Sequence, residues 1–501
     1  MTGWSFDRGH RFDNGHSGGA HVAVVGAGIS GLAGAHRLRT LLGPAARITV
    51  FDRADRIGGA LRTVELAGQP MDVGAEAFMA RRPEVPALLA ELGLTDRAVS
   101  PSPATPTIRA AGRTVPLPAG TLLGVPGSAA ELDGLLPAAA LARVAGERAV
   151  PLRWAAGGDR ALGKLLRERF GDEVADWLVE PLLGGVYAGR VDRLGTRACV
   201  PGLAAALDAG AGSLTEAVDQ LLTAPSESAP CGPYGPVFGA LRGGYQVLLD
   251  ALRVSADPAP RLGLPVRELT RRVNGWLLEV GSAGAPERVE VDAVLLAVPA
   301  PALRRLLAGV APAVSRVAGD VELASSVVVA LAYRAEDVVT LPVSSGVLIA
   351  ADEPLASKAV TYCSRKWPHL SAAATDGLVR LRASLGRAGG DPDTAALRVC
   401  DDELATRVRA DLAALAGVTA GPVAAHVQRW GGGLPQYGVG HGARVAELER
   451  AVGELPGLEV AGAMLHGVGV PACIGTARAA AERIAAHLAC RPARLSGSMA
   501  I

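Results

Sequence analysis

The sequence predicts an α/β (mixed α+β) protein with a discontinuous Rossmann-like dinucleotide-binding domain, a β-sheet domain and a mainly helical insertion. Three observations predict this fold class. A valine-rich run at 21–25 passes through a glycine-rich turn into apolar residues at helical spacing. Strand-like runs return at 266–298 and at 458–462, and apolar residues at helical spacing fill 161–183 before them. The nucleotide-binding sheet is therefore expected to be completed by segments far apart in the chain.

Composition narrows the functional classes. The chain has 501 residues, 49% of them hydrophobic, which suits two or three packed units. Fifty Lys plus Arg against 49 Asp plus Glu leave a net charge of +1, so no nucleic-acid partner is expected. No apolar run reaches the roughly 20 residues of a transmembrane helix, although contact with a membrane surface stays open.

Cysteine usage and the first residues indicate a cytoplasmic protein. Six single cysteines show neither a CxxC pair nor the spacing of a zinc site, so a reducing compartment and no metal are expected. The first 20 residues lack the apolar core of a secretion signal, which argues against export.

The first strand–turn–helix carries the most chemistry. Gly26, Gly28 and Gly31 form the sequence GAGISG, and Asp52 stands about 20 residues further, after the strand-like run RITVF. The first glycine permits the turn, the second lets backbone N–H groups approach a pyrophosphate, and the third lets the helix pack closely on the strand. The helix N-terminus favours phosphate, and an acid at position 52 can accept hydrogen bonds from ribose hydroxyls. A glycine-rich turn without a ligand is the alternative.

A second glycine-rich turn follows closely. Arg56, Gly58 and Gly59 lead through a strand-like segment at 63–66 into MDVGAEAF at 71–78. This turn could bring backbone against a second part of the same ligand, or it could serve packing alone. At this point both NAD and FAD fit the unit.

The middle of the chain is less regular. Residues 93–150 are expected to form loops and short helices, and 161–183 two helices with a break at Gly171. The glycine-rich stretch 184–195 is expected to be a turn against a helix or a ligand, and 241–251 a turn leading into a helix.

Strands then dominate. We expect a meander at 266–269, 276–280 and 288–291, and an interior strand of the nucleotide sheet at 293–298, because that last run is continuously apolar. A second sheet is expected from runs at 326–333, 346–350, 359–364 and 378–385. A short strand at 458–462 and a glycine turn then lead into a long helix that ends near residue 488. The N-terminus of this helix can face the electron-rich edge of a flavin, with packing alone as the alternative role of the helix.

The expected domain organisation follows from these segments. In chain order it comprises a tail at 1–20, the nucleotide domain in three parts at 21–92, 236–305 and 426–490, a mainly helical insertion with substrate-domain elements at 93–235, the substrate-domain sheet at 306–425, and a tail at 491–501.

From about residue 21 to 488 the chain resembles the oxygen-dependent, FAD-containing porphyrinogen oxidases of haem biosynthesis. The motifs that carry the resemblance are VVGAGISGLA at 24–33, RIGG at 56–59, DVGAEAFMARRPE at 72–84, GDEVADWLVEPLLGGVYAG at 171–189, KWPH at 366–369, RWGGGLPQYGVGH at 429–441 and GVGVPACI at 467–474. The chain departs from the family pattern at Asp52, where Glu is usual, and at Ala472 and Ala477, where Asp and Gly are common.

The resemblance implies FAD as the cofactor, and it assigns the cofactor contacts. The implied FAD-binding residues are Gly26, Ala27, Gly28, Ile29, Ser30, Gly31, Asp52, Arg53, Arg56, Gly58, Gly59, Gly74, Ala75, Glu76, Ala77, Val266, Trp430, Val468, Gly469 and Val470. Arg81 and Arg82 follow the DVGAEAF motif closely, so they are the candidates for binding substrate propionates, with solvated surface charge as the alternative.

The resemblance also implies the reaction. A porphyrinogen would lose hydride to the flavin and protons from its pyrrole nitrogens, and molecular oxygen would reoxidise the flavin with release of hydrogen peroxide. Coproporphyrinogen III is the favoured substrate and protoporphyrinogen IX the alternative. A flavin amine oxidase, a carotenoid desaturase and a non-catalytic FAD-binding or haem-chaperone protein are further alternatives. The catalytic residues and the oligomeric state stay open.

Overall fold

The computed structural model describes residues 19–223, 237–257, 259–388 and 397–490. The expected tails at 1–20 and 491–501 lie outside this range, apart from residues 19 and 20. Among the described residues, no helix is long and apolar enough to cross a bilayer.

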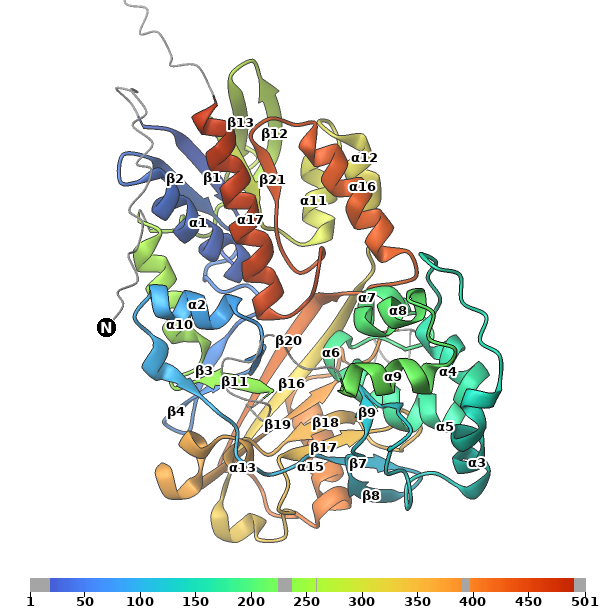
Figure 1. The fold of residues 1–501 in the computed structure, drawn as a ribbon. Helices are drawn as coiled ribbons and strands as arrows, with labels where there is room; N and C mark the ends of the chain where they lie inside the picture. Colours follow the sequence, from blue (N-terminus) through green and yellow to red (C-terminus); the bar gives the residue numbers. More distant parts are fainter. Residues whose placement is uncertain (1–18, 224–236, 258, 389–396, 491–501) are drawn as a thin grey trace, which may run out of the picture.

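A four-stranded parallel sheet forms the upper part of the molecule in Figure 1. Its order is β2 (Arg47–Phe51), β1 (His21–Val25), β15 (Ala293–Leu296) and β21 (Leu458–Val460). The prediction that residues 293–298 form an interior strand is confirmed for 293–296, because β15 pairs with both β1 and β21. Distant parts of the chain thus share one sheet, and the carboxyl ends of its strands meet at one edge.

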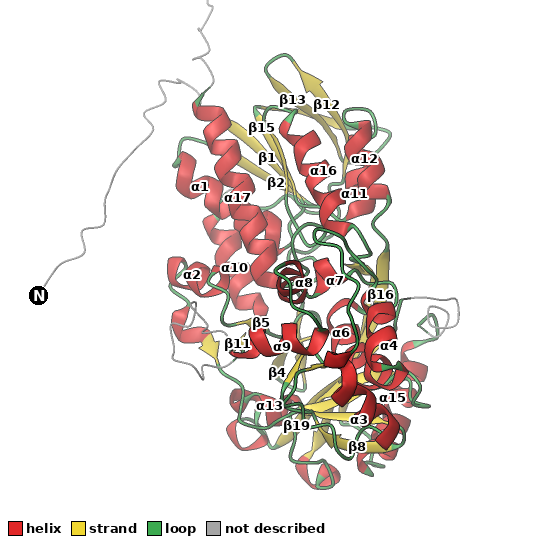
Figure 2. Ribbon diagram, turned by 45° about the vertical axis from the view of Figure 1, so that its right-hand side comes forward, coloured by secondary structure: helices red, strands yellow, loops and turns green. Residues whose placement is uncertain are grey.

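Helices cover both faces of this sheet, as Figure 2 shows. On one face α1 (Ile29–Leu42), α10 (Tyr245–Ser255) and α17 (Val470–Ala489) pack on alternate residues of the strands, together with α2 (Glu84–Glu91). The other face is covered by α11 (Ala300–Leu307), α12 (Pro312–Gly319), α16 (His441–Gly453) and the meander of β12 (Val266–Arg272), β13 (Gly275–Val280) and β14 (Glu287–Val291). The strands are buried on both faces, which is why they are continuously apolar.

A seven-stranded sheet forms the lower part of the molecule in Figure 1. Its order is β20 (Ala424–Pro435), β16 (Leu323–Arg334), β19 (Leu378–Leu385), β18 (Ser357–Thr361), β17 (Gly346–Ile349), β7 (Thr107–Ala110) and β8 (Arg113–Pro116). One face packs on α15 (Asp401–Ala416). The opposite face meets the hairpin of β3 (Thr63–Leu66) and β4 (Gln69–Asp72) at one end, and the helical insertion at the other.

The helical insertion contains short helices around one apolar cluster. They are α3 (Ala138–Gly146), α4 (Leu162–Phe170), α5 (Asp172–Val174), a π-helical turn at Ala175–Val179, α6 (Glu180–Tyr187), α7 (Thr196–Cys199), α8 (Pro201–Asp208) and α9 (Leu214–Thr223). A two-stranded ribbon of β9 (Thr121–Leu122) and β10 (Val125–Pro126) lies beside them, and β5 (Phe78–Met79), β11 (Phe238–Leu241) and β6 (Ala98–Val99) form a further small sheet.

Several expectations for the middle of the chain are corrected. The stretch 93–150 contains two strands of the seven-stranded sheet, β7 and β8, which were missed because each has only four residues. The expected turn at 184–195 begins only at Ala188, since α6 continues through Gly184 and Gly185 to Tyr187. Backbone hydrogen bonds and packing of this helix outweigh the glycine penalty of about 1 kcal/mol per residue. The predicted break at Gly171 is confirmed, with φ of +93° at that residue.

Two further boundaries differ from the expectations. The strand expected at 359–364 ends at Thr361, and the short helix α13 (Cys363–Lys366) follows, so that the chain turns toward the β3–β4 hairpin. Residues 426–435, which we grouped with the nucleotide domain, lie in β20 of the larger sheet. This strand carries Trp430, which contacts the site described below.

Candidate functional site

The first glycine turn lies between β1 and α1 at the carboxyl edge of the parallel sheet. Gly26 has φ of +108°, a conformation that favours glycine, and its N–H donates to the carbonyl of Phe51 at 2.7 Å. A Cβ on Gly31 would lie 1.7 Å from the carbonyl oxygen of Gly26, so the helix can approach the turn only with glycine there. The protein's own packing thus explains the first and third glycines.

Gly28 has no such explanation within the protein. Its φ of −75° and ψ of 179° are open to any residue, and a Cβ would meet nothing closer than the Cα of Gly59 at 3.7 Å. The N–H groups of Ile29, Ser30 and Gly31 have no hydrogen-bond acceptor in the described part of the chain. A glycine beside unpaired helix N-terminal amides is the arrangement that accepts a phosphate. The turn therefore fits the diphosphate of a dinucleotide cofactor.

Asp52 fixes the same turn from the end of β2. Its carboxylate accepts hydrogen bonds from the N–H of Ala27 at 2.6 Å and of Ala54 at 2.8 Å. The carbonyl of Asp52 accepts from the N–H of Leu264 at 2.8 Å, which brings β12 and its first residue Val266 to this edge. The acid is therefore held beside the turn, where a ribose of a bound nucleotide would lie.

The second glycine turn packs directly on the first. The N–H of Gly58 donates to the carbonyl of Ala27 at 2.8 Å, and both Gly58 and Gly59 have positive φ. Arg56 braces this turn by donating to the carbonyl of Gly59 at 2.8 Å, and its guanidinium lies 5.8 Å from the centre of the Trp430 ring. The two turns form one continuous backbone surface.

Trp430 of β20 places the larger sheet beside the second glycine turn. Its indole N–H donates to the carbonyl of Val73 at 2.9 Å, and a Cβ on Gly74 would lie 3.2 Å from the indole ring and 2.1 Å from the carbonyl oxygen of Ala60. Glycine at 74 is therefore required by this close packing. The order along the site is nucleotide turn, second turn, then Gly74 and Trp430.

Glu76 begins a charged cluster next to this position. Its carboxylate accepts hydrogen bonds from the indole N–H of Trp367 and, at 3.3 Å, from the ammonium of Lys366. Burial raises the pKa of Glu76, but the charges of Lys366 and Arg382 and these hydrogen bonds outweigh it and hold the pKa below its usual value. The thiol of Cys363 lies 3.7 Å from the same carboxylate. Glu76 is therefore an anion already satisfied by the protein.

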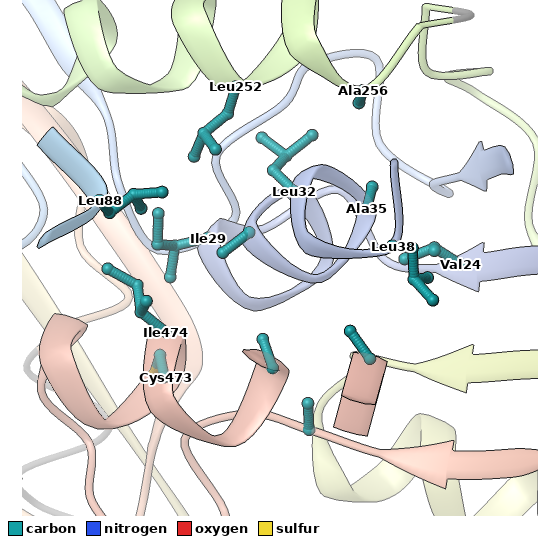
Figure 3. Packing of buried hydrophobic residues seen from close by; sticks show 14 of the residues in the cluster. Val24, Ile29, Leu32, Ala35, Leu38, Leu88, Leu252, Ala256, Cys473 and Ile474 are labelled. Atoms are coloured by element: carbon teal, nitrogen blue, oxygen red, sulfur yellow. The ribbon is translucent and has the colours of Figure 1, made fainter. Parts of the chain in front are cut away.

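A second helix N-terminus lies beside that of α1. Val468 and Gly469 precede α17, which begins at Val470 with Pro471 in its first turn. Figure 3 shows Ile29 at the start of α1 against Ile474 of α17. The positive ends of two helices therefore meet at the carboxyl edge of the sheet, where they favour negative charge on a ligand.

The departures from the family pattern are accommodated locally. Ala472 is buried in the first turn of α17, and Ala477 is fully buried where α17 packs on α1. The Cβ of Ala477 lies 3.8 Å from the position that a Cβ on Gly34 of α1 would occupy, so the two helices pack closely here. Alanine at 477 thus fits the helix contact.

The contacts above bring the two glycine turns, Asp52, Gly74 and Trp430 together, whereas three of the predicted site residues are exposed arginines. Arg82 donates to the carboxylate of Glu84 at 3.1 Å, and Arg81 and Arg53 are exposed. The placement of these three does not test their predicted roles, which stay predictions.

Sequence reasoning missed a buried acid next to the site. Asp72 accepts a hydrogen bond from the hydroxyl of Thr63 at 2.5 Å and from the N–H of Tyr245, the first residue of α10, at 3.1 Å. Burial raises the pKa of Asp72 to about 7, against the effect of these hydrogen bonds. The sequence carries one trace of this contact, the glycine at position 244. A Cβ on Gly244 would lie 2.8 Å from the Asp72 carboxylate, so the close approach favours glycine there. Among the described residues, no group of three or more His, Cys, Asp or Glu side chains could hold a metal ion.

Comparison with known proteins identifies related chains. The family model described as flavin containing amine oxidoreductase matches residues 29–485. Coproporphyrinogen III oxidase of Mycobacterium tuberculosis is 48% identical over 471 residues, covering 94% of this chain and 98% of the relative. Coproporphyrinogen III oxidase of Bacillus subtilis is 28% identical and covers 94% of this chain and 99% of the relative.

A solved structure shows the same likeness. A protein of Exiguobacterium sp. 255-15, provisionally named protoporphyrinogen oxidase, superimposes with a TM-score of 0.79 at 28% identity. The match covers 93% of this chain and 99% of that protein. The likeness therefore spans both sheets and the helical insertion.

Proposed function

Because the chain belongs to the flavin containing amine oxidoreductase family and, within it, to the porphyrinogen oxidases, we propose that it oxidises coproporphyrinogen III to coproporphyrin III in haem biosynthesis. The acceptor in this proposal is molecular oxygen, and the cofactor is FAD. The observation that carries the proposal is the near-full-length match to coproporphyrinogen III oxidases at 48% identity. The resemblance stated from the sequence motifs is confirmed at the level of the family.

The geometry of the glycine turns supports FAD as the flavin. Gly28 leaves space beside unpaired N–H groups for a diphosphate, and Asp52 stands where a ribose would lie. Arg56, Gly74 and Trp430 lie next to these turns and would hold the isoalloxazine part of the cofactor. These residues bind and orient the cofactor, and the N-terminus of α17 stabilises negative charge on it.

The chemistry divides between cofactor and protein. Bound FAD would supply the redox chemistry, which is acceptance of hydride from the bridging carbons of the porphyrinogen and reoxidation by oxygen with hydrogen peroxide as the second product. The protein has to orient the macrocycle and to exclude other electron acceptors, because formation of the aromatic product drives the reaction. Glu76 does not act as a general base in this proposal, since its hydrogen bonds from Trp367 and Lys366 hold it as a satisfied anion.

A direct test uses the cofactor's own colour. The purified protein should be yellow, and anaerobic addition of coproporphyrinogen III should bleach it, with colour and hydrogen peroxide appearing on admission of air. A protein that stays yellow with every porphyrinogen would contradict the proposal and favour a non-catalytic flavoprotein.

Protoporphyrinogen IX is the second candidate substrate, because the related Exiguobacterium structure carries the name of that activity. With equal concentrations of both porphyrinogens under air, coproporphyrin should accumulate faster, as resolved by chromatography with fluorescence detection. A preference for protoporphyrin would overturn the choice of substrate but leave the flavin chemistry in place.

A further inference from the structure

Lys358 is a buried cation without a partner. It lies on β18 with 4% of its surface exposed, and it makes no hydrogen bond or ion pair with any residue that the structure describes. Burial, together with the charges of Arg387 and Arg382, lowers the pKa of Lys358 to about 7, and no carboxylate among the described residues opposes this. A buried, unpaired ammonium costs several kcal/mol. The part of the chain that the structure describes therefore gives Lys358 no compensating contact.

The use of lysine at this position is itself unusual in this chain. Only three of the 50 basic residues are lysines, and the other two are Lys164, exposed on α4, and Lys366, paired with Glu76. A lysine ammonium is a compact donor that changes its protonation when buried, which an arginine does not. Position 358 therefore holds a cation that can respond to a ligand.

The strand geometry places this cation on the sheet face that meets the site. The register between β18 and β19 shifts at Lys358, so that Lys358 is an extra residue beside Ala359, which pairs with Ser384. The next residue, Val360, packs into the apolar cluster with α15. Because side chains alternate along a strand, Ala359, Ser384 and Arg382 lie on the opposite face. That face carries the β3–β4 hairpin at one end and α6 at the other.

Arg382 links this face to the segment at residues 72–77, which lies beside the second glycine turn. It donates to the carbonyl of Asp72 at 2.9 Å, and its charge helps to lower the pKa of Glu76. Arg382 therefore lies beside the Gly74–Ala77 turn, and Lys358 follows it outward along the sheet.

Arg387 extends the row toward the helical insertion. It donates to the carbonyl of Ile349 at 2.7 Å, and its charge acts on both Lys358 and Glu180 of α6. Glu180 is the carboxylate that faces this end, and it already accepts hydrogen bonds from the N–H of Val191 at 2.8 Å and from Arg190 at 3.4 Å. The row of Arg382, Lys358 and Arg387 thus brings three basic side chains together, of which Lys358 is buried and the two arginines are half-buried.

We propose that Lys358, flanked by Arg382 and Arg387, binds carboxylate groups of the substrate. The inference rests on the proposed function for the identity of that substrate, a tetrapyrrole with four carboxylate side chains. Carboxylates would offset the buried positive charge and supply the acceptor that Lys358 lacks. The site would favour a tetracarboxylate over an analogue with fewer acidic side chains, because loss of the carboxylate opposite Lys358 would leave its ammonium without an acceptor.

The test compares Lys358→Met with Lys164→Met in the flavin-loaded enzyme. Lys164 is exposed on α4, away from the proposed site, so its replacement removes the same charge without affecting the row of basic residues. The probe is coproporphyrin III, the stable oxidised tetracarboxylate, titrated by absorbance and fluorescence. Lys358→Met should weaken binding by about 10- to 100-fold, the loss expected for one charge-assisted hydrogen bond, while Lys164→Met and the flavin content of both variants stay unchanged.

Two further measurements separate binding from a structural role. Calorimetry at pH 8 in buffers of different ionisation enthalpy should show proton uptake when coproporphyrin III binds the wild type, and none with Lys358→Met. The unliganded Lys358→Met variant should melt at the same temperature or higher, because a buried unpaired charge is removed. A conservative Lys358→Gln variant checks that the effect does not depend on the methionine.

Each outcome decides the inference. Equal affinity of wild type and Lys358→Met for coproporphyrin III would overturn the role of Lys358 while leaving the proposed function intact. A variant that melts several degrees lower, or fails to fold, would assign Lys358 a structural role and overturn it as well. A wild type that binds no coproporphyrin III would overturn both the proposed substrate and the carboxylate site.

Discussion

Replacing Gly28 by Ala tests the cofactor site separately from the fold. The backbone at Gly28 has φ of −75°, which alanine adopts freely, and the new Cβ would lie 3.7 Å from the nearest protein atom outside its own neighbours. The helix cap loses about 1 kcal/mol with alanine, and the unfolded chain loses entropy worth about 0.4–1 kcal/mol in the opposite sense. The free energy of unfolding of the flavin-free protein should therefore change by less than about 1 kcal/mol.

Flavin binding should respond much more strongly. The Cβ would occupy the space in which a diphosphate approaches the N–H groups of the turn, and two charge-assisted hydrogen bonds at about 1.5–3 kcal/mol each would be lost. The dissociation constant for FAD should rise by a factor of about 10²–10⁴. Titration of the flavin-free protein with FAD, followed by quenching of flavin fluorescence, measures this constant, and thermal unfolding by circular dichroism measures the stability. The bulkier Gly28→Val variant should purify colourless.

Two other glycines provide the controls. Gly442→Ala also places a Cβ in the first turn of a helix, with nothing within 4 Å, so it should leave the affinity for FAD unchanged and raise the stability by up to about 1 kcal/mol. Gly31→Ala places its Cβ 1.7 Å from the carbonyl oxygen of Gly26 and should destabilise the flavin-free protein itself. Wild-type affinity for FAD in Gly28→Ala would refute the assignment of this turn to the cofactor.

Three further predictions follow from the same contacts. Glu76→Gln leaves the Lys366 ammonium unpaired and should cost about 3 kcal/mol at pH 7. Because the pKa of Glu76 is lowered on folding, the wild type should have the higher free energy of unfolding above about pH 4.5, and this difference should shrink as the pH falls further. Urea unfolding at pH 7 and pH 4 measures it. Trp430→Phe removes the hydrogen bond to the carbonyl of Val73, so the free energy of unfolding should fall by about 1 kcal/mol and the visible flavin spectrum should shift. Joint replacement of Arg81 and Arg82 by Ala should alter the Michaelis constant for coproporphyrinogen III by less than about twofold, since both are exposed; a ten- to hundredfold increase would instead assign them to propionate binding.

The nucleotide turn could be predicted because its physical causes are local in sequence. Gly26, Gly28, Gly31 and Asp52 fall within one strand–turn–helix–strand unit, and the spacing alone sets their geometry. The continuously apolar run of β15 likewise predicted an interior strand, because parallel strands are buried on both faces.

The charged clusters could not be predicted in this way. Glu76 meets Lys366 and Trp367 across some 290 residues of sequence, and nothing near either position signals the contact. Lys358 looks like an ordinary strand residue until the register shift and the burial of β18 are known. The helix through Gly184 was missed because intrinsic preference opposes it, and tertiary packing decides the outcome.

The position of β21 has a consequence for synthesis on the ribosome. β15 can pair with β1 once residue 296 has emerged, but its other edge stays unpaired until residues 458–460 follow about 160 residues later. At roughly 5–20 residues per second, that interval lasts about 8–30 s. Throughout it an apolar strand edge is exposed to mispairing with other nascent chains, and α17 is still missing from the mouth of the cofactor site. Tight capture of the flavin is therefore expected only after α17 has been synthesised and has packed on α1.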